Sequence, residues 1–470
     1  MTGHVSAHGL LLRDVEVDDC LVDVRVRGDR VVEVGTHLRA ERELRIDGRG
    51  GALLPGLHDH HLHLHAMAAA ETSVDVGPSA VASLDELAAA LRSARPTGGW
   101  IRAVGYHESV AGDIDRSTLD AALPGMPVRV QHRGGALWIL SSAALDLVAP
   151  LLEQDLPGIE RDAAGRPTGR LWRLDHELQP WLPDRTTQQR DALAGVARHL
   201  LSLGITGVTD ATPAIDHDGL GLLHATNPLR LHLLGAPDDA VLPAGWSRGP
   251  RKLLLHDHDL PTFDDLLTMI DPQSDGSHRR PVAVHCVTRE SLILTLAALD
   301  TVGSCPGDRI EHGAVIPPDL DDALLAHRLV VVTQPDFLRS RGDDYLRDVD
   351  AHDRDHLYRW ATLGRSGVPV VPSSDAPFGE TDPWQVIRSA RDRRTSAGAT
   401  VGPDDRVDAS TALAGYLTTP GDPGGRSRRI QPGATADLCL LGRPRADVLA
   451  DPSASHVETV IVGGTVAWTR

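Results

Sequence analysis

The hydrophobic pattern divides the chain into two kinds of segment. Near both ends, short runs of alternating apolar and polar residues are typical of β-strands that bury one face. These runs lie within residues 10–34 and 437–462, and Gly463-Gly464 then predicts a hairpin turn. Because both chain ends carry this pattern, we predict one small β-sandwich domain built from residues 1–52 and 403–470.

The middle of the chain, residues 53–402, repeats a different unit. A short apolar run ends in polar or ionisable residues, and a stretch with helical spacing follows several of these runs, as at residues 191–203, 290–299 and 319–327. The runs predicted as strands are Leu53–His63, Ile205–Asp210, Leu229–Gly235, Lys252–His256, Val282–His285, Arg309–His312, Val330–Gln334 and Val368–Asp375.

Strands that alternate with helices in this way predict an α/β protein with a closed (β/α)8 TIM barrel. The alternative is a doubly wound open sheet, which would carry a glycine-rich phosphate-binding turn after its first strand. Residues 57–61, Leu-His-Asp-His-His, are unlike such a turn. The interval between the first and second strands is too long for a simple crossover, so we predict an inserted cap region, residues 70–190, over the mouth of the barrel.

Composition and charge narrow the classes of partner. The net charge of −18 disfavours a nucleic-acid-binding protein, which would need a basic face. No apolar segment is long enough to span a membrane, and no basic region followed by an apolar stretch marks a secretion signal. The four scattered cysteines indicate a reduced, cytoplasmic protein. We therefore expect a small-molecule substrate, neither nucleic acid nor membrane as partner, and a homodimer as the candidate assembly.

Lysine is almost absent from the chain. The 47 lysine and arginine residues include one lysine, Lys252, at the start of the predicted fourth strand. One interpretation is chance survival on the surface. The other is a requirement for an amine that can lose its proton, which arginine cannot do at any accessible pH.

Ionisable side chains gather at the predicted strands. His61 and His63 are separated by one residue and therefore point to the same face of the first strand. Later strands contribute one residue each: Lys252, His285, His312 and Asp375. Any single one of the 24 histidines is weak evidence, but the joint pattern predicts a metal site where barrel enzymes hold their active sites. Imidazole and carboxylate ligands suit zinc, and also iron, nickel or manganese.

Several motifs resemble those of a known family. Residues 54–63, Leu-Pro-Gly-Leu-His-Asp-His-His-Leu-His, are similar to the P-G-x-x-D-x-H-x-H opening of the amidohydrolase superfamily. Val284-His285, residues 309–313 (Arg-Ile-Glu-His-Gly) and residues 373–377 (Ser-Ser-Asp-Ala-Pro) match its later motifs. Within the superfamily, the branch of N-substituted formamide deformylases is the most similar. Residues 100–102, 141–145 and 165–169 carry this second resemblance.

The resemblance implies roles for the candidate residues. His61 and His63 would bind the more buried metal, and His285 and His312 the second. Lys252 would be N-carboxylated and bridge two metals. Asp375 would be both a ligand and the proton acceptor, so that Asp375 and His312 are the candidate catalytic residues. The implied cofactor is one or two divalent metal ions, zinc above all, and the implied reaction is hydrolysis of a non-peptide amide-type C–N bond by metal-activated water.

The chain also departs from the branch. Gly134-Gly135 stands where a Gly-His pair is usual, and Leu140 stands where an asparagine is usual. His256-Asp257-His258 follows Lys252 in place of the usual Asp-Gly. This difference leaves open a mononuclear site, in which His61, His63, His285 and Asp375 bind the metal and His312 polarises the substrate.

The mononuclear pattern would suit a deaminase. Two other functions also stay open: a lactonase, and a non-catalytic protein that uses the same fold for association. His58, His60 and His65 are additional to the candidate ligands, and we expect His60, which points away from His61 and His63, to be packed or solvated. For His132, Arg133 and Trp138 in the inserted region we expect a structural role, with contact to substrate as the alternative.

Overall fold

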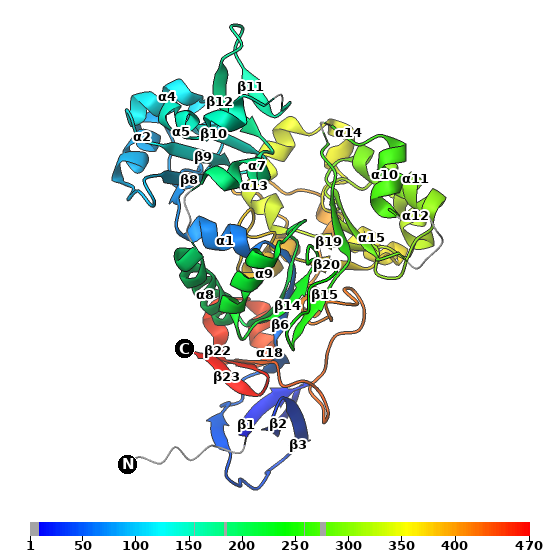
Figure 1. The fold of residues 1–470 in the computed structure, drawn as a ribbon. Helices are drawn as coiled ribbons and strands as arrows, with labels where there is room; N and C mark the ends of the chain where they lie inside the picture. Colours follow the sequence, from blue (N-terminus) through cyan, green and yellow to red (C-terminus); the bar gives the residue numbers. More distant parts are fainter. Residues whose placement is uncertain (1–8, 155, 183–185, 258, 273–278) are drawn as a thin grey trace, which may run out of the picture. The chain divides into compact units, whose positions relative to one another are not determined.

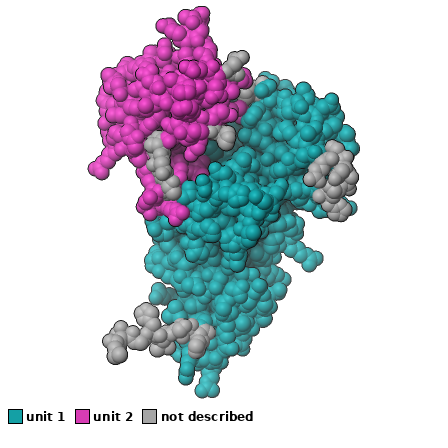
Figure 2. Space-filling model, in the orientation of Figure 1, with its two compact units in different colours: residues 1–64, 194–470 teal, residues 65–193 magenta. Residues whose placement is uncertain are grey.

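The computed structural model describes residues 9–154, 156–182, 186–257, 259–272 and 279–470 (Figure 1). The chain forms two compact units. Unit 1 comprises residues 1–64 and 194–470, and unit 2 comprises residues 65–193 (Figure 2). No helix within the described residues has the length and apolar character needed to cross a membrane.

Parallel strands that alternate with helices form the centre of unit 1. One sheet has the order β15-β14-β13-β6 and another has the order β16-β17-β18-β19-β20. Their bounds are β6 Leu57–Leu62, β13 Ile205–Asp210, β14 Arg230–Leu233, β15 Trp246–Arg248, β16 Arg251–Leu254, β17 Val282–Cys286, β18 Arg309–His312, β19 Val330–Thr333 and β20 Val370–Pro372. β17, β19 and β20 are mainly apolar, as is usual for parallel strands that are covered on both faces, whereas β6 and β18 carry buried polar residues. The protein is therefore of the α/β class, as predicted.

The predicted first strand, residues 53–63, is two strands in two different sheets. β5 (Leu53–Pro55) pairs antiparallel with β21 (Leu438–Leu441), whereas β6 pairs in parallel with β13. Gly56 lies between them, where a Cβ atom would collide with the Thr206 side chain. The single apolar run conceals this change of sheet because both strands are buried.

A short strand that was not predicted, β15, comes directly before β16, the predicted fourth strand. β15 pairs with β14, and β16 pairs with β17, so the chain leaves one sheet and enters the other at Gly249-Pro250. Proline cannot donate a hydrogen bond to a ladder. A Cβ atom at residue 249 would lie 2.6 Å from His232 Nε2, which explains the glycine.

The opposite edges of the two sheets are joined at the predicted site. The amide of Asp375 donates to the carbonyl of His61, and the amide of His63 donates to the carbonyl of Ala376, both at 2.8 Å. The carboxyl end of β6 and the residues that follow β20 are thus fixed to one another by their backbones.

Both chain ends contribute strands to two sheets that share a hydrophobic core, and the strands pair antiparallel except for β1 and β4, which pair in parallel. One sheet has the order β3-β2-β1-β4 and the other β23-β22-β21-β5. The remaining bounds are β1 Leu10–Val17, β2 Cys20–Arg27, β3 Arg30–Gly35, β4 Leu44–Asp47, β22 Val457–Val462 and β23 Thr465–Thr469. Leu12, Leu53 and Ile461 meet in the shared core. The hairpin at Gly463-Gly464 is present, with positive φ angles of 55° and 74° that favour glycine.

Helices surround the parallel strands of unit 1. They are α9 His217–Leu222, α10 Phe263–Ile270, α11 Arg289–Val302, α12 Asp321–Ala326, α13 Asp336–Asp348, α14 Ala351–Arg354, α15 Ala361–Ser366, α16 Pro383–Asp392, α17 Ala409–Tyr416 and α18 Arg445–Ala450. Helix α17 contacts β20 and β6. Helix α8 (Thr186–Ser202) crosses the boundary between the units and begins earlier than the predicted residue 191.

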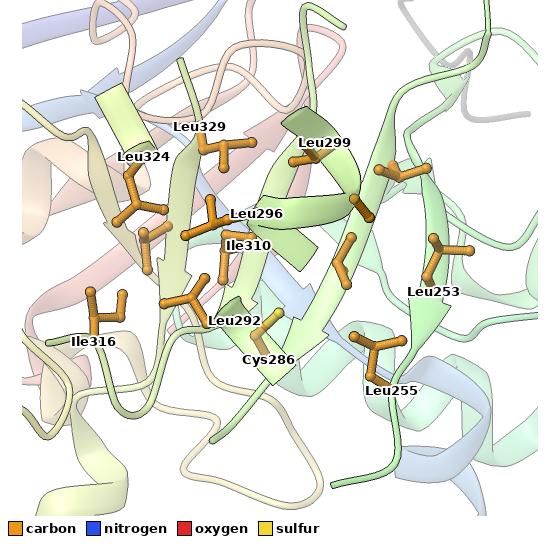
Figure 3. Close-up of a cluster of buried hydrophobic side chains, with 14 of the residues drawn as sticks. Leu253, Leu255, Cys286, Leu292, Leu296, Leu299, Ile310, Ile316, Leu324 and Leu329 are labelled. Atoms are coloured by element: carbon orange, nitrogen blue, oxygen red, sulfur yellow. The ribbon is translucent and has the colours of Figure 1, made fainter. Parts of the chain in front are cut away.

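A cluster of buried aliphatic side chains packs these helices on the second sheet. Leu292, Leu296 and Leu299 of α11 meet Ile310 of β18, and Leu324 of α12 adjoins them (Figure 3). Aromatic residues make up only 3% of the chain, so branched aliphatic side chains fill this volume. Such a core is sensitive to the loss of single methyl groups.

We expect Leu299→Ala to lower the free energy of unfolding by about 2–5 kcal/mol, because the side chain is 1% exposed and its removal leaves a cavity. Ile293→Ala on the same helix is the matched control, since Ile293 is 47% exposed. Urea denaturation of both variants measures the difference. Equal midpoints for the two variants would contradict this account of the core.

Unit 2 has its own sheet and its own cores. The strand order is β11-β12-β10-β9-β8-β7. The strands are β7 Val74–Asp75, β8 Ile101–Tyr106, β9 Val128–His132, β10 Leu137–Leu140, β11 Ile159–Arg161 and β12 Pro167–Trp172. The helices are α1 Leu64–Glu71, α2 Leu84–Ser93, α3 Glu108–Ala111, α4 Arg116–Ala122, α5 Ser142–Leu147, α6 Ala149–Leu152 and α7 Asp175–Leu178. Its placement over the barrel mouth stays a prediction.

Candidate metal centre

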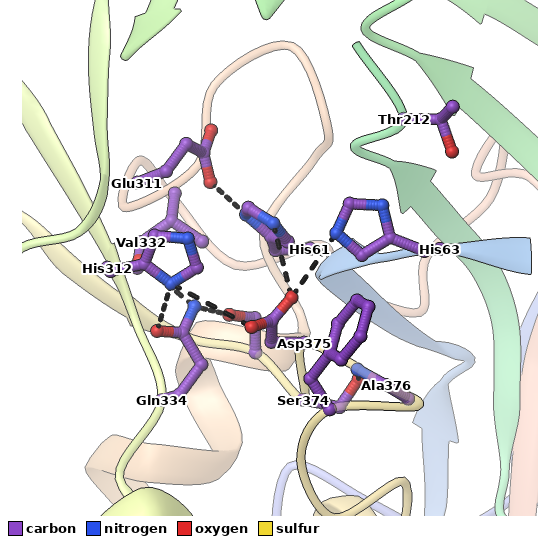
Figure 4. Close-up of polar contacts among 12 residues, drawn as sticks. His61, His63, Thr212, Glu311, His312, Val332, Gln334, Ser374, Asp375 and Ala376 are labelled. Carbon is purple, nitrogen blue, oxygen red and sulfur yellow. Dashed lines mark hydrogen bonds and ion pairs between the residues drawn. The ribbon is translucent and has the colours of Figure 1, made fainter. Parts of the chain in front are cut away.

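The strand ends of unit 1 bring the predicted site residues together. His61 belongs to β6 and His63 follows it, Lys252 lies in β16, and His285 lies in β17. The remaining two, His312 at the end of β18 and Asp375 three residues beyond β20, complete the set. Figure 4 shows His61, His63 and His312 around the Asp375 carboxylate.

The distances define one continuous cluster. Asp375 Oδ1 lies 3.5 Å from His61 Nε2 and 3.3 Å from His63 Nε2. Lys252 Nζ lies 3.4 Å from His61 Nε2. The ring of His312 is 4.9 Å from that of His61 and 4.4 Å from that of His285, measured between centroids. His61, His63 and Asp375 each present a ligand atom, and these atoms lie within 4.8 Å of one another.

Glu311 fixes the protonation of His61. The Nδ1–H group of His61 donates to the Glu311 carboxylate, and both side chains are fully buried. Burial and the nearby Lys252 lower the pKa of His61 to about 3, so the ring is neutral. Its Nε2 lone pair therefore faces the carboxylate oxygen of Asp375. Two acceptors turned toward each other are suited to a shared cation.

Gln334 fixes the protonation of His312 in the same way. The amide nitrogen of Gln334 donates to Ser373 Oγ at 2.9 Å and lies 3.4 Å from the Val332 carbonyl, which can only accept. The amide oxygen of Gln334 consequently faces His312 and accepts from its Nδ1–H at 2.9 Å. Burial lowers the pKa of His312, which is therefore neutral, with its Nε2 available as a ligand.

The charged members of the cluster also have displaced pKa values. Burial lowers the pKa of Lys252 to about 8. Burial alone would raise the pKa of Asp375, but the hydrogen bond from His63 and the neighbouring His312 and His61 hold it below its ordinary value. Asp375 is thus ionised at neutral pH, and Lys252 loses its proton far more readily than an exposed lysine.

The backbone at two of these residues is unusual. His312 and Asp375 have positive φ angles of 70° and 54°, in the left-handed region that non-glycine residues rarely adopt. Residues held in this way cluster at functional sites, because the surrounding structure must compensate for the strain. The hydrogen bond from the Asp375 amide to the His61 carbonyl supplies part of that compensation.

The other histidines of the first motif are not part of the cluster. His58 contacts Thr209 Oγ1 at 2.9 Å, and His60 contacts the Gly415 carbonyl and Thr418 Oγ1 at 3.1 and 3.0 Å. Both side chains therefore have partners outside the site, and for His60 this agrees with the prediction from strand alternation. His65 belongs to unit 2.

The loop after β16 is tied to a neighbouring helix. Asp257 accepts a hydrogen bond of 2.7 Å from Thr288, the residue that caps α11. Of the three residues His256-Asp257-His258, which stand where the similar branch has Asp-Gly, the last lies outside the described residues.

A second histidine cluster lies in unit 2 and is built for hydrogen bonding. His107, Glu108 and His132 lie close enough to hold an ion. However, His132 Nδ1 accepts from the amide of Gly134 at 3.0 Å, so its proton is on Nε2, which donates to Glu108 at 3.1 Å. Arg133 also lies 2.8 Å from His107 Nε2, where its positive charge opposes a cation.

Two further unit 2 residues named from the sequence are structural. Trp138 is buried and donates its indole N–H to Asp175 at 2.7 Å. Leu140, at the position where the similar branch has an asparagine, is fully buried in an apolar core. Leucine at residue 140 therefore contributes to an apolar core, where an asparagine would place a polar group.

Sequence reasoning missed Glu311 and Gln334. Glu311 stands inside a motif that was recognised, next to His312, but its partner His61 is 250 positions earlier in the chain. Gln334 ends a predicted strand and carries no motif. A glutamate within a short buried strand and a glutamine directly after an apolar strand were the available signals, because buried polar groups need partners.

Comparisons with known proteins agree on one family. A family model described as the amidohydrolase family matches residues 45–272 and 276–467. An N-substituted formamide deformylase from Arthrobacter pascens is 26% identical over 510 aligned residues, covering 92% of this chain and 91% of that protein.

Solved structures share the fold at lower identity. A metal-dependent hydrolase from Pyrococcus horikoshii superposes with a TM-score of 0.72 at 18% identity, over 92% of this chain and 97% of the other. N-isopropylammelide isopropylaminohydrolase from Burkholderia multivorans has a TM-score of 0.52 at 16% identity, over 98% of each chain.

Proposed function

This chain belongs to the amidohydrolase family and is an enzyme acting on carbon–nitrogen bonds, and on that premise we propose that it hydrolyses a non-peptide amide-type bond of a small molecule. The observation that carries the proposal is the convergence of His61, His63 and Asp375, with Lys252, His285 and His312 beside them. The similarity to an N-substituted formamide deformylase supports a substrate that carries an N-acyl group.

The donor set suits a divalent metal, and we propose zinc, as one or two ions. His61, His63, His285, His312 and Asp375 would hold it, with Lys252 as a further ligand if the amine is carboxylated. A divalent cation of this kind lowers the pKa of water to about 7 and polarises a carbonyl group.

The residues of the chain then have distinct tasks. Asp375 is ionised, so it can take a proton from the attacking water and deliver it to the leaving nitrogen. His312 has its only ring proton on Nδ1, committed to Gln334. It cannot donate a hydrogen bond from Nε2 to a substrate, so the protonation state favours a ligand role over the substrate-polarising role of the deaminase alternative.

A panel of substrates tests the reaction. We expect the metal-loaded enzyme to release an amine from N-substituted formamides or other N-acyl amines. The same preparation is assayed with aminated heterocycles, where ammonia marks deamination, and with lactones. Turnover of heterocycles or lactones without turnover of any amide would refute amide hydrolysis while keeping the metal site.

The state of Lys252 predicts a pH dependence of metal loading. Only the neutral amine adds carbon dioxide, and a pKa of about 8 makes the neutral fraction rise from about a tenth at pH 7 to about nine tenths at pH 9. We expect zinc uptake by the metal-free protein to increase over this range and to increase further with bicarbonate. Lys252→Met removes the amine, and its uptake should respond to neither. A variant that responds like the wild type would exclude carboxylation.

We also propose finer features of the architecture and setting. The backbone bonds between residues 61–63 and 375–376 support a closed (β/α)8 barrel, and the core shared by the terminal sheets supports a β-sandwich. The division at residues 52 and 403, the cap position of residues 70–190 and the homodimer stay predictions. That the protein has no membrane or nucleic-acid partner is likewise still a prediction. The free cysteines support the proposed cytoplasmic location.

A further inference from the structure

The two histidines with assigned protons have partners of different charge. His61 donates its Nδ1–H to a carboxylate, that of Glu311, whereas His312 donates to the neutral amide of Gln334. A hydrogen bond to an anion is stronger than one to a neutral amide, and it makes the opposite ring nitrogen a better electron donor. The two imidazoles are therefore unequal as ligands.

Arg309 keeps the Glu311 carboxylate ionised and in place. Its Nε donates to Glu311 Oε1 at 2.6 Å, and its Nη2 donates to the His60 carbonyl at 3.3 Å. Glu311 is fully buried and Arg309 is 1% exposed, so the pair is shielded from solvent. Although burial alone would raise the pKa of Glu311, Arg309 and His61 hold it well below its usual range.

These contacts form a closed ring of interactions. Arg309 binds the backbone of β6 at residue 60, Glu311 binds Arg309, and His61, the next residue of β6, binds Glu311. The ring fixes the orientation of the imidazole as well as its protonation. Rotation of His61 would break a hydrogen bond to a buried anion that has few other partners.

We propose that Glu311, fixed by Arg309, is a positioning residue that makes His61 a stronger ligand than His312 and so raises the affinity of the centre for its metal. The inference rests on the proposed function, in which His61 binds the metal. It concerns residues that do not themselves touch metal or substrate.

The test measures zinc affinity of the metal-free protein by competition with a chelator. Glu311→Gln gives His61 the same kind of partner that His312 has, but it leaves Arg309 buried without a counter-ion and can prevent folding. The double variant Arg309→Met, Glu311→Gln removes both charges and keeps the net charge of the site. We expect it to bind zinc about 10–100-fold more weakly than the wild type.

Control variants separate positioning from general damage. Glu290→Gln changes an exposed glutamate, 65% accessible in its side chain, and should leave the affinity unchanged. The unfolding midpoint of each metal-free variant reports on overall integrity. In the cobalt-loaded proteins, the visible absorption bands should shift in the double variant and not in Glu290→Gln, because only the former changes the hydrogen-bond partner of a ligand, His61.

The outcomes distinguish this inference from the proposed function. Wild-type zinc affinity and an unchanged cobalt spectrum in a folded double variant would overturn the role of Glu311 alone. If His61→Ala bound zinc as tightly as the wild type, His61 would not be a ligand, and the proposed metal centre would fail as well.

Discussion

Replacing Asp375 with asparagine is expected to lower kcat by about 10²–10⁴-fold, the usual contribution of a general acid–base group. The carboxylate is ionised at neutral pH and lies within 3.5 Å of two imidazole nitrogens, so it is placed to take a proton at the centre. Asparagine has nearly the same shape but cannot accept that proton. Steady-state kinetics with saturating zinc measure the loss, so that weaker metal binding does not contribute.

The matched control for this substitution is Asp300→Asn. Asp300 is exposed and pairs with His327 at 3.1 Å on the surface. We expect its kcat to equal that of the wild type. If Asp375→Asn turned over substrate like the wild type, Asp375 would not transfer a proton in the reaction. The metal content of this variant would then show whether Asp375 acts only as a ligand.

Removing the metal is expected to abolish activity altogether. Without a divalent cation, the neutral His61 and the ionised Asp375 have no means of activating water at pH 7. Dialysis against a chelator, followed by addition of one divalent metal at a time, measures the dependence. The metal that restores the highest kcat identifies the functional ion.

The same metal-removal and re-addition experiment can be carried out on the variant His61→Ala. We expect this variant to stay inactive at zinc concentrations that fully restore the wild type, because the loss of one of the clustered ligands weakens the site. His217→Ala, in which a histidine with a 66% exposed side chain is removed, is the control and should be restored normally. Full activity in a preparation that contains no detectable metal would refute the proposed chemistry.

The sequence predicted the members of the site better than their arrangement. Strand alternation was sufficient to place His61 and His63 on one face and His60 on the other. Lys252 was identified because it is the single lysine, and its burial beside His61 agrees with a special role. These predictions depend on local periodicity and composition, which a single sequence displays.

Features that depend on distant partners could not be predicted. Glu311 meets His61 across 250 positions, and no local pattern records that contact. The change of sheet at Gly56 was hidden because β5 and β6 follow each other directly and β6 is buried along its whole length, so no polar, exposed interval separates them. Gly249 is required by the side chain of His232 on a neighbouring strand, which a single sequence does not reveal.

The reciprocal backbone bonds between residues 61–63 and 375–376 have a consequence for biosynthesis. His61 leaves the ribosome long before Asp375, and at ordinary rates of translation the delay is about 15–60 s. During that interval the nascent chain carries histidines but no complete site. The full set of candidate ligands therefore exists only after translation has passed Asp375, and a product truncated before this residue would lack both the carboxylate and the backbone bonds that join β6 to the residues after β20.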